Sequence, residues 1–114
     1  MPAKLLPIAG AFHSPAMASA REEFAEALGW IPVDESRIPV FSCMSAAPME
    51  HPRYPLAQGL TNPVRWRETL VALRGHGVKS LIEVGPGRML TGLVKRTLNG
   101  VEATTAQRLA GAGV

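Results

Sequence analysis

Residues 81–98, LIEVGPGRMLTGLVKRTL, decide the fold of this 114-residue chain. The stretch opens with Leu81 to Val84, an apolar run of the kind that forms a buried strand. A Gly-Pro-Gly turn follows at residues 85–87, and apolar residues then recur at helical spacing, at Leu90, Leu93, Val94 and Leu98. The stretch therefore predicts a strand, a tight turn and an amphipathic helix.

Earlier segments show the same alternation. Residues 5–12 and 38–44 are apolar runs that predict strands, and an amphipathic helix is predicted between them because Ser14 and Pro15 are typical of a helix start. Residues 62–75 predict a further helix, where Asn-Pro repeats the start signal and glycines follow the apolar stripe. Strand, helix, strand, helix order favours parallel pairing, so the predicted fold class is α/β, with a small parallel sheet flanked by helices.

The composition indicates one folded, turn-rich domain. Hydrophobic residues make up 46% of the chain and charged residues 18%, which excludes a disordered composition, and ten prolines with eleven glycines imply short elements joined by tight turns. Residues 101–114 are rich in alanine and glycine and weakly patterned, so they are predicted to be a flexible tail after a domain at residues 1–100.

Several classes of function are disfavoured. The twelve Lys and Arg residues form no run and the net charge is +3, which argues against nucleic-acid binding. No stretch approaches the roughly 20 apolar residues of a membrane span, and no secretory signal is present, so we expect a cytoplasmic protein that does not bind membranes. The single cysteine excludes an internal disulfide, and since no Cys/His metal spacing or cofactor fingerprint occurs, we expect no metal and no cofactor.

Three loops follow the predicted strands, at the carboxyl ends where open parallel sheets bind ligands: His13, residues 43–47 and residues 85–87. His13 is the best candidate for a proton shuttle, because imidazole titrates near neutral pH, although a lone histidine after a strand more often has a structural role. Cys43 is more readily a buried, inert thiol than a nucleophile, since no cationic residue is near it in sequence. The Gly-Pro-Gly turn matches no phosphate-binding fingerprint and is more often a simple tight turn.

Three segments taken together carry a resemblance. LPIAGAFHSPAM at 6–17, LTNPVRWRETLVAL at 60–73 and the opening stretch closely resemble the C-terminal portion of malonyl-CoA:acyl carrier protein transacylases and of polyketide synthase acyltransferase domains. The match runs from about Leu5 to Gly100 in the family's order. It implies a partial acyltransferase domain over residues 1–100, forming the C-terminal part of the hydrolase-like core of the acyltransferase fold. It also implies that the strand at residues 5–12 belongs to a ferredoxin-like subdomain whose other strands are missing, so this strand should not pair fully.

The resemblance implies roles for three residues. In the family a serine within a Gly-His-Ser-x-Gly elbow attacks malonyl-CoA, and a histidine in an Ala-Phe-His-Ser-like motif is its base; His13 occupies the matching position. A main-chain carbonyl of a glutamine just ahead of Asn-Pro-Val orients that histidine, and Gln58 occupies that place. Phe12 matches relatives that select malonyl over methylmalonyl, which implies a substrate-binding role. The implied partners are malonyl-CoA and acyl carrier protein, in fatty acid or polyketide synthesis.

The sequence departs from the family in its nucleophile, because no Gly-x-Ser-x-Gly occurs in the 114 residues. One hypothesis is a C-terminal fragment of an S-malonyltransferase, either truncated or one half of a split enzyme that a nucleophile-bearing partner chain completes. The alternative is a non-catalytic remnant or interaction module that binds a carrier protein or partner subunit. The fragment is favoured, because truncation explains an orphaned catalytic motif more simply than a new use does. Either way, the isolated chain is expected to be inactive.

Overall fold

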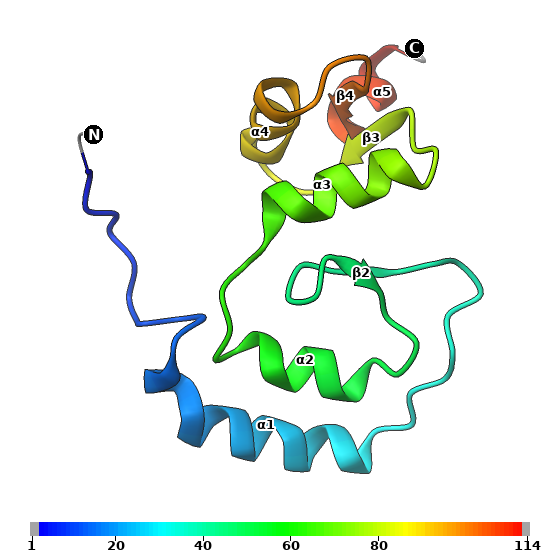
Figure 1. The fold of residues 1–114 in the computed structure, drawn as a ribbon. Helices are drawn as coiled ribbons and strands as arrows, with labels where there is room; N and C mark the ends of the chain where they lie inside the picture. The colour runs from blue at the N-terminus through cyan, green and yellow to red at the C-terminus, as the bar shows by residue number, and fades with distance from the viewer. Residues whose placement is uncertain (1–2, 113–114) are drawn as a thin grey trace. The chain divides into compact units, whose positions relative to one another are not determined.

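The computed structural model describes residues 3–112, which divide into two compact units on either side of the boundary between Val64 and Arg65 (Figure 1). The α/β fold class predicted from the sequence is confirmed. No helix within the described residues is long and apolar enough to cross a bilayer.

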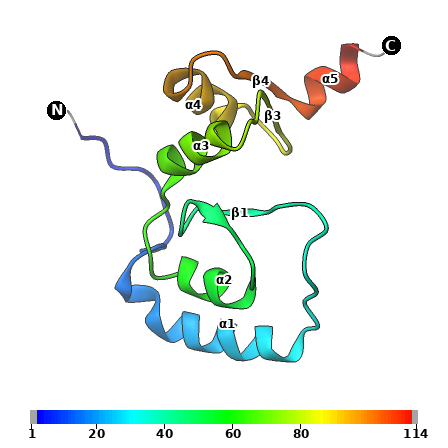
Figure 2. The same cartoon turned by 45° about the vertical axis from the view of Figure 1, so that its right-hand side comes forward.

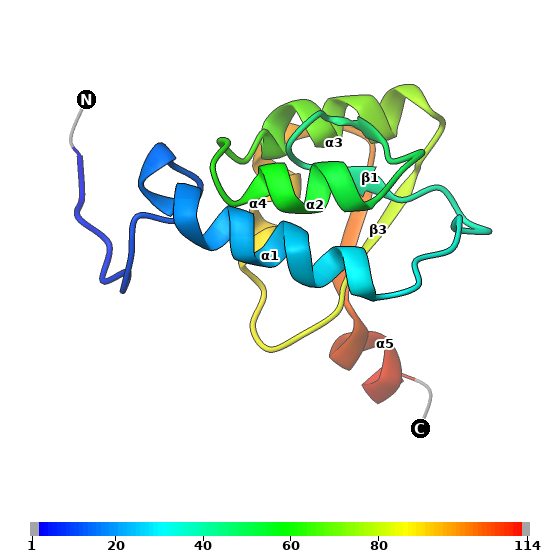
Figure 3. The same ribbon diagram turned by 90° about the horizontal axis from the view of Figure 1, so that it is seen from below.

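The first unit is built on two helices. A short 3-10 helix, η1 (Pro15–Met17), leads into α1 (Ala18–Trp30), and α2 (Arg53–Gly59) packs beside α1 (Figure 3). The predicted start at Ser14 and Pro15 is confirmed, with Pro15 in the first helical turn. α1 ends two residues before Pro32, because a proline has no N–H with which to continue the helix.

The strand predicted over residues 38–44 is wrong in extent and pairing. The structure has a short hairpin, in which β1 (Phe41–Ser42) pairs antiparallel with β2 (Ala47–Pro48). Pro39 removes a backbone donor from the predicted strand, and Ala46, with φ 55°, turns the chain back on itself.

Residues 5–12 form no strand, so the strand predicted there is also wrong. Leu5 is 98% exposed, and Leu6 and Ile8 are exposed with it. A strand needs a neighbour for its backbone groups, and none of the segments within residues 3–112 pairs with this one. This agrees with the incomplete pairing that the resemblance implies.

The second unit contains a parallel pair of strands, of which the opening stretch predicts the first but not its partner. Its elements are α3 (Trp66–Gly75), β3 (Ser80–Glu83), α4 (Met89–Thr97), β4 (Glu102–Thr105) and α5 (Ala106–Ala112). β3 and β4 pair in parallel, with Ser80 opposite Glu102 and Glu83 opposite Thr105, and α4 connects them. A parallel pair requires such a crossover, which explains why the strand, turn and helix at 81–98 fix this unit.

The flexible tail predicted over residues 101–114 is wrong for the part that the structure describes. Residues 102–105 form β4, which leads directly into α5 (Figure 2). Backbone hydrogen bonds hold β4 in place, starting with the N–H of Glu102, which donates to the carbonyl of Lys79 at 2.9 Å. Residues 113 and 114 lie outside the described part of the chain, and the domain boundary at residue 100 stays a prediction.

The core of the second unit is small and apolar. Leu70 of α3 packs with Val94 of α4 and with Leu98 just after that helix, all three buried, and further apolar side chains surround them. Val94 and Leu98 are two of the inward positions that the helical spacing predicts.

We expect Leu70→Ala to destabilise the second unit by about 2–5 kcal/mol, because Leu70 is fully buried and its removal leaves a cavity. Val71→Ala is the matched control on the same helix, since Val71 is 44% exposed and its truncation removes little buried surface. Urea denaturation of both variants measures the difference. Equal losses would contradict the assigned core.

Candidate active site

His13 has a left-handed backbone, with φ 59°, which is uncommon for a residue with a side chain. Two hydrogen bonds around it hold the turn: the hydroxyl of Ser14 donates to the carbonyl of Ala11 at 2.6 Å, and the N–H of Met17 donates to the carbonyl of Ser14 at 3.0 Å. Such backbone strain persists where the surroundings enforce it, and it concentrates at functional sites.

The imidazole of His13 is held by one main-chain acceptor. Its Nδ1 lies 2.7 Å from the carbonyl oxygen of Gly59, at the end of α2. A carbonyl can only accept a hydrogen bond, so Nδ1 carries the proton and the lone pair of the neutral ring is on Nε2. The geometry therefore leaves His13 with a free basic nitrogen.

The orienting carbonyl belongs to Gly59 and not to Gln58, which corrects the assignment that the resemblance implies. The carbonyl of Gln58 instead accepts from the N–H groups of Thr61 and Asn62, each at 3.1 Å, and from the side-chain amide of Asn62 at 2.7 Å. These bonds close the end of α2, so the amide of Asn62 serves this turn and α3 begins later than predicted. Helix ends leave carbonyls without intrahelical partners, and sequence carries little signal for which one faces a neighbour.

His13 opens onto a hollow of about 230 Å³ in the first unit. β1 contributes Ser42 and the loop after it contributes Cys43 and Met44, so the structure brings together two of the three loops that the sequence singles out. Residues 85–87 belong to the second unit. The rest of the lining comes largely from the apolar end of α2 and the segment after it, so the hollow suits an uncharged chain beside a base.

The other predicted site residues lie less centrally. Phe12 is 53% exposed, its ring covers Gly10, and it does not line the hollow. Cys43 lines the hollow and is half-buried, with its thiol free. Within residues 3–112, no three His, Cys, Asp or Glu side chains gather into a set that could hold a metal ion.

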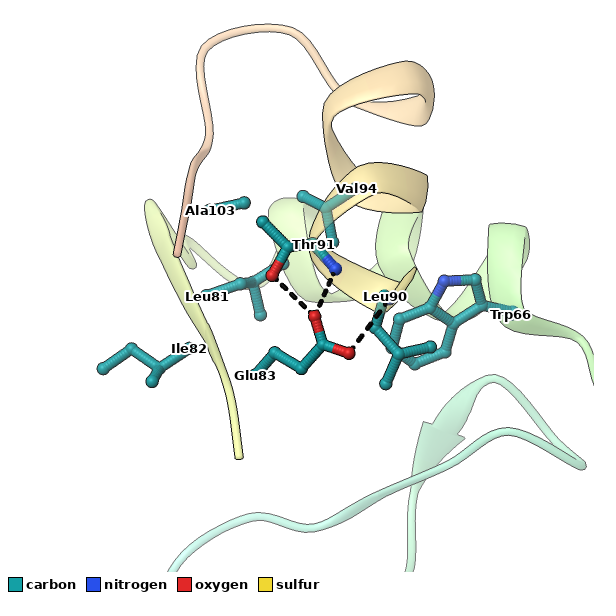
Figure 4. A pocket seen from close by; sticks show the side chains of 8 residues that line it. All are labelled: Trp66, Leu81, Ile82, Glu83, Leu90, Thr91, Val94 and Ala103. Carbon is teal, nitrogen blue, oxygen red and sulfur yellow. Dashed lines mark hydrogen bonds between the residues drawn. The ribbon is translucent and has the colours of Figure 1, made fainter. Parts of the chain in front are cut away.

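The Gly-Pro-Gly turn of the second unit precedes α4, and a side chain of the same unit already accepts hydrogen bonds from N–H groups at the start of that helix. Figure 4 shows the carboxylate of Glu83 reaching the first turn of α4, beside an apolar cavity of about 80 Å³. One oxygen accepts from the N–H of Leu90 at 3.1 Å, and the other accepts from the N–H and the hydroxyl of Thr91 at 2.8 and 2.7 Å. These are the donors that an external anion would use, so the geometry favours the tight-turn interpretation.

The hydrogen bonds from Thr91, first from its hydroxyl and then from its N–H, hold the pKa of Glu83 below its usual range. Both favour the ionised carboxylate over the protonated form. The carboxylate is therefore a structural cap of α4.

The chain is similar to known transacylases over most of its length. It is 41% identical over 95 residues to a malonyl CoA-acyl carrier protein transacylase of Synechocystis sp., a match that covers 81% of this chain and 32% of that protein. No family model matches the chain. The chain thus spans about a third of the length of this curated relative.

Solved structures give the same result. A malonyl-CoA:acyl carrier protein transacylase from Xanthomonas oryzae superposes with a TM-score of 0.86 at 30% identity, covering 94% of this chain and 36% of that one. A malonyl-transacylase in complex with its type II polyketide synthase acyl-carrier protein superposes with a TM-score of 0.84 at 34% identity, covering 89% of this chain and 34% of that one.

We expect Glu83→Gln to lower the melting temperature at pH 7, because the amide carries no charge to stabilise the start of α4. Since the folded pKa of Glu83 is lowered, its contribution is complete above about pH 4.3, the unfolded value, and is lost as the pH falls through the folded value. The difference between the wild type and the variant should therefore shrink at acidic pH. Glu102→Gln, which changes an exposed carboxylate on β4, is the control. A constant difference from pH 7 to pH 2.5 would contradict the assigned cap.

Proposed function

Because the chain is homologous to the C-terminal portion of malonyl-CoA-acyl carrier protein transacylases, we propose that it is the base-bearing fragment of an S-malonyltransferase of fatty acid or polyketide synthesis. The observation that carries the proposal is the hydrogen bond from His13 Nδ1 to the carbonyl of Gly59, which leaves Nε2 basic. The serine nucleophile then comes from the part of the enzyme that this chain does not contain, and malonyl-CoA and acyl carrier protein are the substrates of the completed enzyme.

In the first half-reaction, Nε2 of His13 takes the proton of the serine hydroxyl as the serine oxygen attacks the thioester carbonyl of malonyl-CoA. The coenzyme A thiolate leaves and recovers the proton from the imidazolium, which gives a malonyl-serine ester and free thiol. In the second half-reaction, Nε2 takes the proton of the carrier protein's thiol, the sulfur displaces the serine oxygen, and the serine regains a proton. The Gly59 carbonyl accepts from Nδ1–H throughout and stabilises the transient imidazolium.

The second unit supports an incomplete enzyme. Parallel sheets in proteins have both faces covered by other elements. The sheet of β3 and β4 has two strands, and it leaves apolar side chains exposed. Ile82 in β3 is 52% exposed and Val84, just after β3, is 84% exposed, although both are apolar. A nucleophile-bearing partner would supply the missing cover.

The proposal is tested by mixing this chain with the part of the Synechocystis transacylase that precedes the matched residues, and following malonyl transfer from coenzyme A to acyl carrier protein. Neither polypeptide alone should transfer malonyl, and the mixture should. His13→Asn in the mixture should lower the rate about 10²–10⁴-fold, because the base is lost. Asparagine tolerates the left-handed backbone and keeps an N–H donor, so the melting temperature should change little.

Two outcomes would contradict the proposal: transfer by the isolated chain, or an unchanged rate with His13→Asn in an active mixture. Carrier-protein binding by the isolated chain, combined with no transfer in the mixture, would support the alternative of a non-catalytic interaction module.

Although its ring covers Gly10 and does not line the hollow in this chain, we also propose that Phe12 limits the acyl group to malonyl in the completed enzyme, where an aromatic ring beside the base would fill the space that a branching methyl needs. One methyl group is worth about 10–200-fold in discrimination, so Phe12→Ser in the completed enzyme should lower the malonyl to methylmalonyl preference by at least about tenfold. Phe24→Ser, on α1, is the control. Competition between the two acyl-CoA substrates measures the ratio, and an unchanged ratio in Phe12→Ser would refute this role.

A further inference from the structure

We propose that Arg53 is a positioning residue for His13, and that it acts by fixing α2 against the end of α1. The inference deepens the proposed function, since it rests on His13 being the base.

The end of α1 has an acceptor that its own helix cannot satisfy. The carbonyl of Leu28 would bond the N–H of the residue four positions later, and that residue is Pro32, which has no N–H. The carbonyl of Ile31 follows at the helix end. Both acceptors need donors from elsewhere in the unit.

Arg53 supplies these donors from the first turn of α2. Its Nε donates to the carbonyl of Leu28 at 3.0 Å, and its Nη2 donates to the carbonyl of Ile31 at 2.7 Å. The planar guanidinium holds its donors in a fixed fork, so two bonds set both the position and the direction of the residue that carries it. The first residue of α2 is thereby joined to the end of α1.

The last residue of α2 is Gly59, whose carbonyl holds His13. Gly59 lies six positions after Arg53 along the helix, a distance of about 9 Å, so a tilt of about 10° at one end moves the other by about 1.6 Å. A shift of this size along the line that joins Nδ1 and the carbonyl oxygen takes the 2.7 Å contact outside hydrogen-bonding range, and a sideways shift bends it. Since His13 itself lies just before η1 and α1, the two attachments fix α2 at both of its ends.

The test measures the proton on His13 directly, in the isolated full chain labelled with 15N-histidine. Long-range 1H–15N spectra report whether the neutral ring carries its proton on Nδ1 or on Nε2. We expect Nδ1–H in the wild type, and a fall of about fivefold in the ratio of Nδ1–H to Nε2–H in Arg53→Met, which keeps the aliphatic stem but removes the donors. His13→Asn assigns the signals.

The molecule offers two controls. Arg21→Met removes another arginine from the same groove between α1 and α2, one that makes neither carbonyl contact. His76, in the second unit, has its Nδ1 2.9 Å from the carbonyl of Ala72, so its signals should not respond to any change at Arg53. An unchanged His13 ratio in folded Arg53→Met, or an equal change in Arg21→Met, would overturn the proposal.

Arg53→Lys keeps the experiment decisive if Arg53→Met fails to fold by circular dichroism. A lysine ammonium is a single point donor and cannot span both carbonyls with the arginine fork, so an intermediate fall in the His13 ratio is expected. A wild-type ratio in Arg53→Lys would then overturn the proposal. The NMR measurement needs no serine and no substrate. The Arg53 proposal can therefore be wrong while His13 remains the base of the mixed enzyme. Equally, the mixing experiment can give no transfer while Arg53 still determines which nitrogen of His13 carries the proton.

Discussion

The first unit depends on the hydrogen bond from His13 to the carbonyl of Gly59, which joins segments 46 residues apart in sequence. Closing a loop of this length costs conformational entropy, and the contact must be supported by the elements between its ends. α1 and α2 supply that support by packing on each other. The same bond places the proton on Nδ1, which is the arrangement that the proposed role of His13 as a base requires.

The sequence predicts best where the signal is local. Residues 81–98 carry a complete strand, turn and helix pattern, and β3 and α4 form there as predicted. The predictions at residues 5–12 and 38–44 are wrong because a strand depends on its partner, which lies elsewhere in the chain or outside it. β4 is missed for the same reason, since its half-buried Ala and Thr residues give no strong pattern and its pairing with β3 is a contact across a whole helix.

The candidate site shows the same contrast between local features, which the sequence predicts, and distant contacts, which it does not. The sequence singles out His13 because its motif and its position before a helix start are local features, and its role as a base stays a proposal. Its acceptor is missed by one residue, since any residue can offer a main-chain carbonyl and a glycine leaves no side-chain signal. Arg53 is missed because its partners are also main-chain carbonyls, although Pro32 four residues after Leu28 indicates an acceptor that needs an outside donor.

Two helix ends explain why the proposed site is assigned to the first unit. At the start of α4, the chain's own Glu83 accepts from the free N–H groups, so the partial positive charge of that end is already neutralised. At the end of α2, the carbonyl of Gly59 accepts a hydrogen bond from Nδ1 of His13. The other ring nitrogen, Nε2, takes no part in this contact. The first arrangement occupies the N–H groups of Leu90 and Thr91, whereas the second leaves Nε2 of the His13 ring outside the contact. A proton acceptor that is held in place and remains reactive is what acyl transfer requires of its base.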